Sequence, residues 1–146
     1  MNQLTDHHDK ILIKITNQNK EGKLIDSRVE SVGTLEDVKD NVFWFTIDGE
    51  KRLATKNLVP GKQVYNEKFV LSKGTEYRTW DPFRSKLAAS IMNNLEHFPF
   101  KEKSNVLYLG VSTGTTISHI SDIVGPNGTI FGVEHSSRVA RDFLDR

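Results

Sequence analysis

The chain has 146 residues, of which 36% are hydrophobic, and its 20 Lys and Arg residues against 19 Asp and Glu residues leave a net charge of +1. No apolar run approaches the roughly 20 residues of a membrane-spanning helix, and no charged-then-apolar signal peptide opens the chain. Because cysteine is absent, disulfides and thiolate metal sites are excluded, and we expect a cytoplasmic protein of one or two small domains.

Charge is unevenly distributed along the chain. Residues 51–86 carry 9 Lys and Arg but 3 Asp and Glu, a local balance of +6, whereas residues 1–50 carry 6 and 10, a balance of −4. A basic stretch of this size is typical of proteins that bind phosphate backbones, so nucleic acid is a candidate partner. A solvated surface with uneven charge would explain the same numbers.

The first part of the chain has the pattern of a small β-rich domain. Val42–Ile47 is aromatic and β-branched, which predicts a strand, and Asp48-Gly49 predicts a hairpin turn into a return strand over Lys51–Thr55. Shorter strands are expected at Ile11–Ile15, near Leu24-Ile25, at Val29–Val32 and at Gln63–Tyr65. We therefore expect an N-terminal β domain over residues 1–66 and a linker over residues 67–79.

Helices and strands alternate from residue 80 onward. Asp81 and Pro82 have the residue types of an N-cap and a first helical position, which predicts a helix that ends before Pro99. An apolar stripe of Phe83, Leu87, Ile91 and Leu95 would be its buried face.

Four further elements follow in the pattern. They are a buried strand over Val106–Gly110, a helix after Gly114 that buries Ile117, Ile120, Ile123 and Val124, a strand over Thr129–Glu134, and a helix start near Ser136. Such alternation predicts an α/β fold, with a parallel sheet over residues 80–146.

The turn between the first of these strands and its helix is rich in glycine. Gly110 and Gly114 allow bare backbone to approach a ligand, and the helix N-terminus that follows offers unpaired N–H groups, with the hydroxyls of Thr115 and Thr116 beside them. The spacing is G-x-x-x-G rather than the dinucleotide G-x-G-x-x-G, which counts against a nicotinamide enzyme. A tight turn without a ligand is the alternative.

Glu134 lies 20 residues after Gly114, at the end of the next strand. A carboxylate at this place in a β–α–β unit accepts hydrogen bonds from both ribose hydroxyls of an adenosine. An exposed glutamate at a strand end is a common alternative, but the glycine turn and the glutamate together favour an adenosine-containing ligand.

Lys86 and His119 are the other side chains with possible chemistry. Lys86 adjoins the apolar stripe, and a lysine at the rim of a cofactor cleft can stabilise an oxyanion or hold a phosphate. A surface lysine without a partner is the simpler interpretation. For His119, which falls on the helix after the glycine turn, we expect a structural role.

Several long motifs resemble the fibrillarin family, in its archaeal form because no Gly/Arg-rich arm is present. The resemblance covers roughly Val42 to Arg146. It is carried by Asp48-Gly49, residues 52–61, Val64-Tyr65, residues 77–89 (YRTWDPFRSKLAA), residues 106–110 (VLYLG), residues 112–116 (STGTT) and residues 118–122 (SHISD).

The resemblance implies a small β domain followed by a Rossmann-like S-adenosylmethionine methyltransferase domain. It implies ribose 2′-O-methylation of rRNA and tRNA, directed by a box C/D guide RNA together with a Nop-domain scaffold protein and a kink-turn-binding protein. Lys86 would be the first lysine of a catalytic lysine–aspartate–lysine set. Cofactor contacts would come from Thr115, Thr116, Glu134 and His135, with Gly110 and Gly114 shaping the cradle.

This sequence departs from the family pattern in three residues and in length, and one of the three is Asn66, which stands where Gly is frequent. His135 stands where an aromatic residue, commonly Phe, is usual, and Val111 stands where a small Ala is usual. Only 12 residues follow Glu134, so the catalytic aspartate is not in this sequence and the methyltransferase domain is expected to be incomplete. We expect little methyl transfer from these residues alone; the alternatives are a non-catalytic assembly subunit of the same particle and a decayed product without a stable fold.

Overall fold

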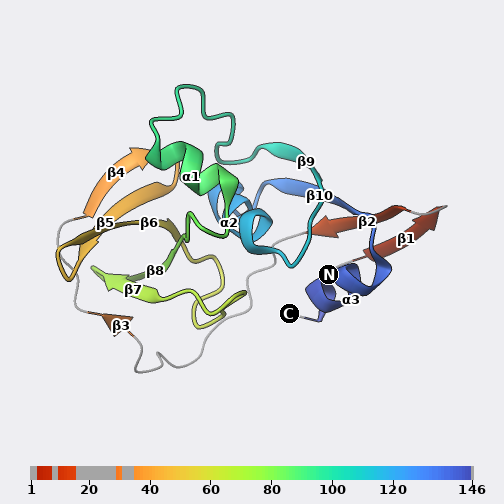
Figure 1. Cartoon of the computed structure of the whole chain (residues 1–146), viewed down its shortest axis with the longest axis horizontal. Coiled ribbons are helices and arrows are strands. Elements are labelled where there is room, and N and C mark those ends of the chain that lie inside the picture. Colours follow the sequence, from red (N-terminus) through yellow and green to blue (C-terminus); the bar gives the residue numbers. More distant parts are fainter. Residues whose placement is uncertain (1–2, 8–9, 16–28, 31–34, 146) are drawn as a thin grey trace.

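Two β-sheets on either side of a central helix make up the computed structural model, which describes residues 3–7, 10–15, 29–30 and 35–145 (Figure 1). The first sheet has the strand order β3-β7-β8-β6-β5-β4 and the second has the order β1-β2-β10-β9. The strands are β1 Gln3–His7, β2 Lys10–Ile15, β3 Val29–Glu30, β4 Leu35–Lys39, β5 Val42–Ile47, β6 Glu50–Lys56, β7 Phe69–Ser72, β8 Thr75–Thr79, β9 Asn105–Leu109 and β10 Thr129–Glu134. The helices are α1 Lys86–Met92, α2 Thr115–Val124 and α3 Ser137–Leu144.

The hairpin β5–β6 forms as the sequence predicts. Asp48 and Gly49 both have positive φ, +52° and +80°, which is the backbone that a two-residue turn between twisted strands requires. The strand expected at Ile11–Ile15 is also present, as part of β2. The strand expected at Val29–Val32 is described only over β3, and the one near Leu24-Ile25 lies outside the described residues.

The segment expected to be a linker, residues 67–79, contains two strands of the first sheet. β7 and β8 form an antiparallel hairpin, and β8 continues the sheet by pairing with β6.

The prediction of a strand at Gln63–Tyr65 is wrong. The backbone N–H groups of Val64 and Tyr65 donate to the Glu67 carboxylate at 2.8–3.1 Å. A side chain thus satisfies these donors in place of a neighbouring strand.

The helix expected from Asp81 to Pro99 is shorter at both ends. Asp81 Oδ1 accepts from Phe83 N at 2.8 Å, so this aspartate organises a turn, and Ser85 is the N-cap of α1, accepting from Ala88 N at 3.3 Å. The helix ends at Met92, and Phe83 lies outside it with its side chain 98% exposed. The expected stripe therefore begins at Leu87.

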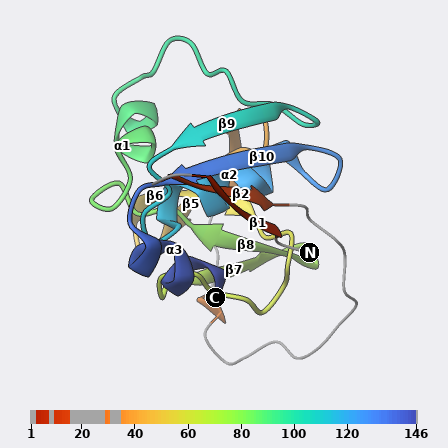
Figure 2. The ribbon, with the colours of Figure 1, turned by 90° about the vertical axis from the view of Figure 1, so that its right-hand side faces the viewer.

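The second sheet contains the expected parallel pair, β9 with β10, in the register Val106 with Ile130. β2 pairs antiparallel with the other edge of β10, so β9 is an edge strand of the described sheet (Figure 2). The expectation that β9 is buried is wrong, because Leu107 and Leu109 are 64% and 72% exposed. Helix α2 covers the opposite face of this strand pair, where Val106 and Tyr108 pack.

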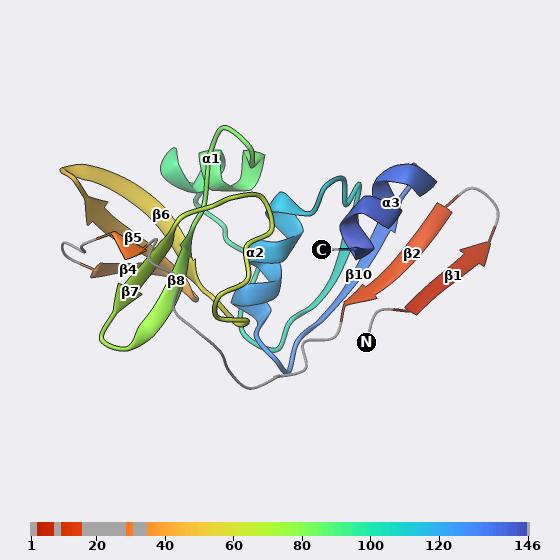
Figure 3. The same ribbon diagram turned by 90° about the horizontal axis from the view of Figure 1, so that it is seen from below.

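Helix α2 lies between the two sheets and forms the centre of the molecule (Figure 3). Ile117, Ile120, Ile123 and Val124 are fully buried, as their spacing predicts. Ile123 packs against the first sheet with Leu53 and Trp80, and Ile120 packs against the second with Ile130. Across the described residues we find no helix that is both long and apolar enough to cross a bilayer.

Candidate functional site

The loop from β9 to α2 depends on glycine at two positions. Gly110 has a φ of +81°, and a Cβ there would meet nothing within 4 Å, so the space above this residue is open. Gly114 has a φ of +93°, and a Cβ there would lie 2.5 Å from the ring of Phe143. Any other residue at Gly114 would therefore strain the backbone and clash with α3. Gly110 N donates to Val133 O at 2.8 Å, which ties the loop to β10.

Glu134 points into this loop from the end of β10. Its carboxylate accepts hydrogen bonds from Ser112 N at 2.7 Å and from Ser136 N at 2.9 Å. These two backbone bonds, the one from Ser136 first, lower the pKa of the carboxyl from its usual value, so Glu134 is ionised at neutral pH. The backbone N–H of His135 is a third donor, and because a carboxylate has about four acceptor positions, Glu134 can still accept a bond from a ligand.

The N-terminus of α2 opens toward the same loop. Its N-cap is Gly114, which has no side chain to cap the first N–H groups of the helix. Thr116 Oγ1 donates to Ser85 Oγ at 2.9 Å, and Ser85 in turn caps α1. This hydrogen bond fixes the start of α1, and hence Lys86, relative to the glycine loop.

Lys86 and Thr116 line one cavity of about 430 Å³. The rest of its lining is Arg84, Leu87, Phe100, Tyr108 and Ile120. The structure thus brings an exposed lysine and a threonine from the first turn of α2 to a single concave surface. His135, in contrast, is exposed directly after β10, and Thr115 is half-buried at the start of α2.

His119 is a structural residue, buried beneath the loop and not exposed to a ligand. Its Nδ1 lies 2.7 Å from Thr55 Oγ1, its Nε2 lies 2.7 Å from the Tyr65 hydroxyl, and its ring stacks on Trp80 at 4.7 Å. Burial, and then the nearby charge of Arg78, lower the pKa of His119 well below its usual value, so the ring is neutral.

The tautomer of His119 follows from its partners. Thr55 Oγ1 gives its only proton to Asp122 Oδ2 at 2.7 Å, so it can only accept from His119 Nδ1. A neutral ring can then only accept at Nε2, and the Tyr65 hydroxyl lies 2.7 Å from it while also facing the Thr79 carbonyl oxygen at 3.0 Å. The hydrogen bonds therefore run from Tyr65 through His119 and Thr55 to Asp122.

A buried arginine joins this chain of hydrogen bonds to the first sheet. Arg78 on β8 donates to Asp122 Oδ2 at 2.8 and 3.0 Å and to Glu67 Oε1 at 2.6 Å, with all three side chains almost completely buried. Asp122 lies on α2, so the ion pair attaches the helix below the glycine loop to the first sheet.

Sequence reasoning missed several residues of this assembly, namely Ser85, Arg78, Tyr65 and Ser112. Ser85 carried a usable signal, because serine directly before a helix is a preferred N-cap. Asp122, which Arg78 binds, and His119, which contacts Tyr65, lie more than 40 positions away from them in the sequence, so local pattern could not indicate these contacts.

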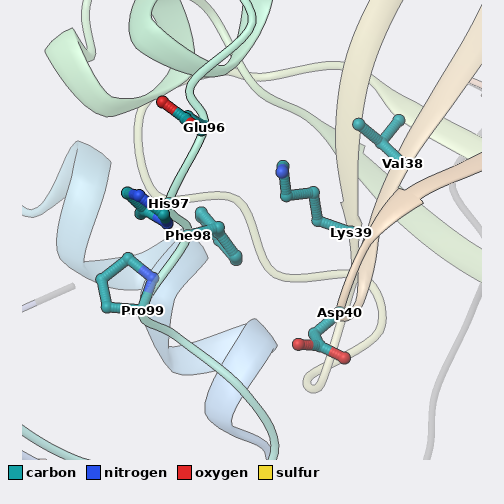
Figure 4. A pocket seen from close by; sticks show the side chains of 7 residues that line it. All are labelled: Val38, Lys39, Asp40, Glu96, His97, Phe98 and Pro99. Atoms are coloured by element: carbon teal, nitrogen blue, oxygen red, sulfur yellow. The ribbon is translucent and has the colours of Figure 1, made fainter.

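A further cavity of about 520 Å³ lies between β4 and the loop after α1 (Figure 4). Its lining is Val38, Lys39, Asp40, Glu96, His97, Phe98 and Pro99. None of the residues singled out from the sequence lines it, and we assign it no role.

Comparison with known proteins gives concordant matches. The fibrillarin family model matches residues 35–146. A fibrillarin-like rRNA/tRNA 2′-O-methyltransferase of Thermococcus onnurineus is 59% identical over 97 residues, which cover 66% of this chain and 43% of that protein. The corresponding protein of Pyrobaculum aerophilum is 57% identical over 99 residues, with 68% and 42% covered.

Two solved structures are similar in fold as well as in sequence. Aeropyrum pernix fibrillarin, crystallised with natively bound S-adenosyl-L-methionine, gives a TM-score of 0.77 at 46% identity, over 80% of this chain and 52% of that one. A Methanococcus jannaschii fibrillarin gives 0.72 at 42% identity, over 80% and 50%. The chain thus spans less than half the length of the curated relatives that it matches.

Proposed function

Because the chain belongs to the fibrillarin family, we propose that it forms part of an S-adenosylmethionine-dependent RNA 2′-O-methyltransferase. The names of the relatives support rRNA and tRNA as substrates. The family resemblance supports a box C/D guide RNA that selects the nucleotide, with a Nop-domain scaffold protein and a kink-turn-binding protein as partners. The residues of the proposed site are Lys86, Gly110, Gly114, Thr115, Thr116, Glu134 and His135.

The observation that carries this proposal is the position of Glu134 over the glycine loop. An ionised carboxylate that can still accept a hydrogen bond faces a loop in which the space above Gly110 is open. Ribose hydroxyls are donors that such a carboxylate accepts, and the uncapped N-terminus of α2 suits the carboxylate of an amino-acid group. The residues present therefore fit S-adenosylmethionine, which supplies an electrophilic methyl group on a sulfonium centre when bound.

Lys86 has the chemistry of an electrostatic catalyst in this arrangement. As a 2′-hydroxyl loses its proton, the Lys86 ammonium at the 430 Å³ cavity would stabilise the developing oxyanion. Thr116 is a positioning residue in addition to a proposed cofactor contact, because its hydrogen bond to Ser85 sets where α1, and so Lys86, begins. The family's catalytic aspartate and second lysine are not assigned to any residue of this chain.

A second candidate function is a non-catalytic assembly subunit of the same particle. It is favoured by the outer face of β9 and β10, where Leu107, Leu109 and Phe131 are exposed. An apolar face of this kind is covered by further polypeptide in parallel sheets, and a subunit that docks through it would not itself need to complete a catalytic site.

An experiment with a chimeric protein distinguishes the methyltransferase from the assembly subunit. The matched 97 residues of the Thermococcus onnurineus relative are replaced by the corresponding residues of this chain. Transfer of a labelled methyl group to a target ribose is then measured with guide RNA and partner proteins. We expect transfer, and we expect Lys86→Ala in the chimera to lower kcat by about 100-fold or more, as removal of an oxyanion-stabilising group does. A folded chimera that binds the partners and transfers nothing would favour the assembly subunit.

A further inference from the structure

The turn between β8 and α1 determines where Lys86 lies, because Lys86 is the first residue of α1. Two hydrogen bonds inside the turn fix its shape: Asp81 Oδ1 accepts from Phe83 N at 2.8 Å, and Asp81 O accepts from Arg84 N at 3.2 Å. These bonds do not set the position of the turn relative to the rest of the molecule. That position depends on contacts at its two ends, Asp81 and Ser85.

The start of the turn is held by the hydroxyl of Tyr65. The hydroxyl oxygen accepts from Asp81 N at 3.3 Å, and its proton faces two acceptors, Thr79 O at 3.0 Å and His119 Nε2 at 2.7 Å. Burial raises the pKa of the Tyr65 phenol above its usual value, so the hydroxyl keeps this proton. One hydroxyl therefore contacts the backbone on both sides of Trp80 and joins it to a side chain of α2.

The end of the turn is held by the same helix. Thr116 Oγ1 donates to Ser85 Oγ at 2.9 Å. Thr116 and His119 are three residues apart on α2, and side chains at this spacing lie on one face of a helix. One face of α2 thus holds both ends of the turn that leads to Lys86, through Ser85 at one end and through Tyr65 at the other.

We propose that Tyr65 is a positioning residue for Lys86 in methyl transfer. Its hydroxyl fixes the start of the turn and, through the turn, holds the Lys86 ammonium at the 430 Å³ cavity, which is lined by other residues. A charge that stabilises an oxyanion is effective only when it is placed in advance where the oxyanion develops, so a small displacement of Lys86 slows the reaction. This inference rests on the proposed function, because it concerns how Lys86 acts in that reaction.

The test uses the chimera with the Thermococcus onnurineus relative and compares kcat for methyl transfer with Kd for S-adenosylmethionine. Tyr65→Phe keeps the ring and removes the hydroxyl. We expect kcat to fall about tenfold and the cofactor Kd to change less than about twofold, because the catalytic group is displaced and the glycine loop is not. Tyr77→Phe is the matched control, at a second buried tyrosine, in the apolar cluster with Phe45 and Val70, and is expected to change neither value.

A double-mutant cycle shows whether Tyr65 acts through Lys86. In a Lys86→Ala background, Tyr65→Phe is expected to change kcat less than about twofold, because the group that it positions is gone. An equal fall in both backgrounds, as a general loosening of the fold would give, or an unchanged kcat in Tyr65→Phe alone, would overturn the proposal. If Tyr65→Phe does not fold, Asp81→Ala interrupts the same path in the turn, and the same two results decide the matter.

Amide hydrogen exchange in the 146-residue chain gives a measurement that does not depend on activity. Tyr65→Phe is expected to speed exchange severalfold at Asp81 N and also at Ala88 N, which donates to Ser85 Oγ, and to leave Ser112 N unchanged. Faster exchange at Asp81 N alone would overturn the proposal, because the start of α1 would then be independent of Tyr65. Failure of the proposed function is separate, since it would appear as an inactive chimera while exchange at Ala88 N still responds to Tyr65→Phe.

Discussion

The two sheets of this protein share the helix α2 but differ in how completely they are covered. The first sheet has apolar clusters on both sides, one with Leu53 and Trp80 and the other with Phe45 and Val70. The strand pair β9–β10 has one cluster, under α2, and exposes Leu107 and Leu109 on its other face. The position of α2 is therefore set mainly by the first sheet, through packing and through the buried pair of Arg78 with Asp122.

This difference has a consequence for the proposed cofactor site. The glycine loop begins at the exposed strand β9 but ends at α2, which is fixed from below. Glu134 accepts from Ser112 and thereby holds the middle of the loop to β10. The geometry of the loop therefore depends on α2 and Glu134 more than on whether further polypeptide covers the exposed face of β9.

The largest effect is expected from Arg78. Arg78→Met leaves the carboxylates of Glu67 and Asp122 buried without their cation, and removal of one partner of a buried ion pair costs about 3–5 kcal/mol. Arg84→Met is the matched control, since its pair with Asp81 is exposed and is expected to contribute about 0–1 kcal/mol. Chemical denaturation gives both values. Equal losses would contradict the role of Arg78 in attaching α2 to the first sheet.

Apolar truncation on the two faces of the β9–β10 pair compares them directly. Ile120→Ala is expected to cost about 2–5 kcal/mol, because it leaves a cavity between α2 and the second sheet. Leu109→Ala is expected to cost less than about 0.5 kcal/mol, because its side chain is already exposed. A large loss at Leu109 in the isolated chain would mean that this face is covered, for example by self-association.

A smaller, pH-dependent effect is expected from His119. Its pKa in the folded protein lies well below the usual value of 6.5, so below that pH the unfolded chain takes up a proton that the folded chain does not. The unfolded state is thereby favoured, and the free energy of unfolding decreases as pH falls from about 6.5. His119→Gln is expected to flatten this part of the profile. A wild-type profile that is level below pH 6.5 would contradict a neutral His119.

Where the sequence predicted the fold, the signal was local. Asp48-Gly49 indicated a hairpin because Asp and Gly both tolerate positive φ. Lys73-Gly74 has the same backbone, with φ of +49° and +78°, but lysine is not a usual turn residue, so the sequence does not indicate the β7–β8 hairpin. Phe83 was placed on a helical stripe because its spacing fits, whereas Asp81 turns the chain and leaves the ring outside.

The candidate site was predictable in part for the same reason. Gly110, Gly114 and Glu134 are recognisable from spacing within one β–α–β unit. The buried hydrogen bonds beneath these residues are not recognisable from spacing, because Thr55 and His119 are 64 residues apart in sequence and meet only through folding. The exposure of β9 does not follow from its sequence, since the continuous apolar run of Val106 to Leu109 is typical of a strand that is buried on both faces.

The most direct test of this account is a calorimetric titration of the chain with S-adenosylmethionine. We predict saturable binding of one equivalent, and at least about tenfold weaker binding by Glu134→Gln and Glu134→Ala, because hydrogen bonds to a charged acceptor contribute about 1.5–3 kcal/mol. Glu102→Ala, at an exposed glutamate, is the control. Absence of binding by the native chain, or an affinity that is unchanged when Glu134 is replaced in a folded protein, would contradict the assignment of the glycine loop and Glu134 as a cofactor cradle.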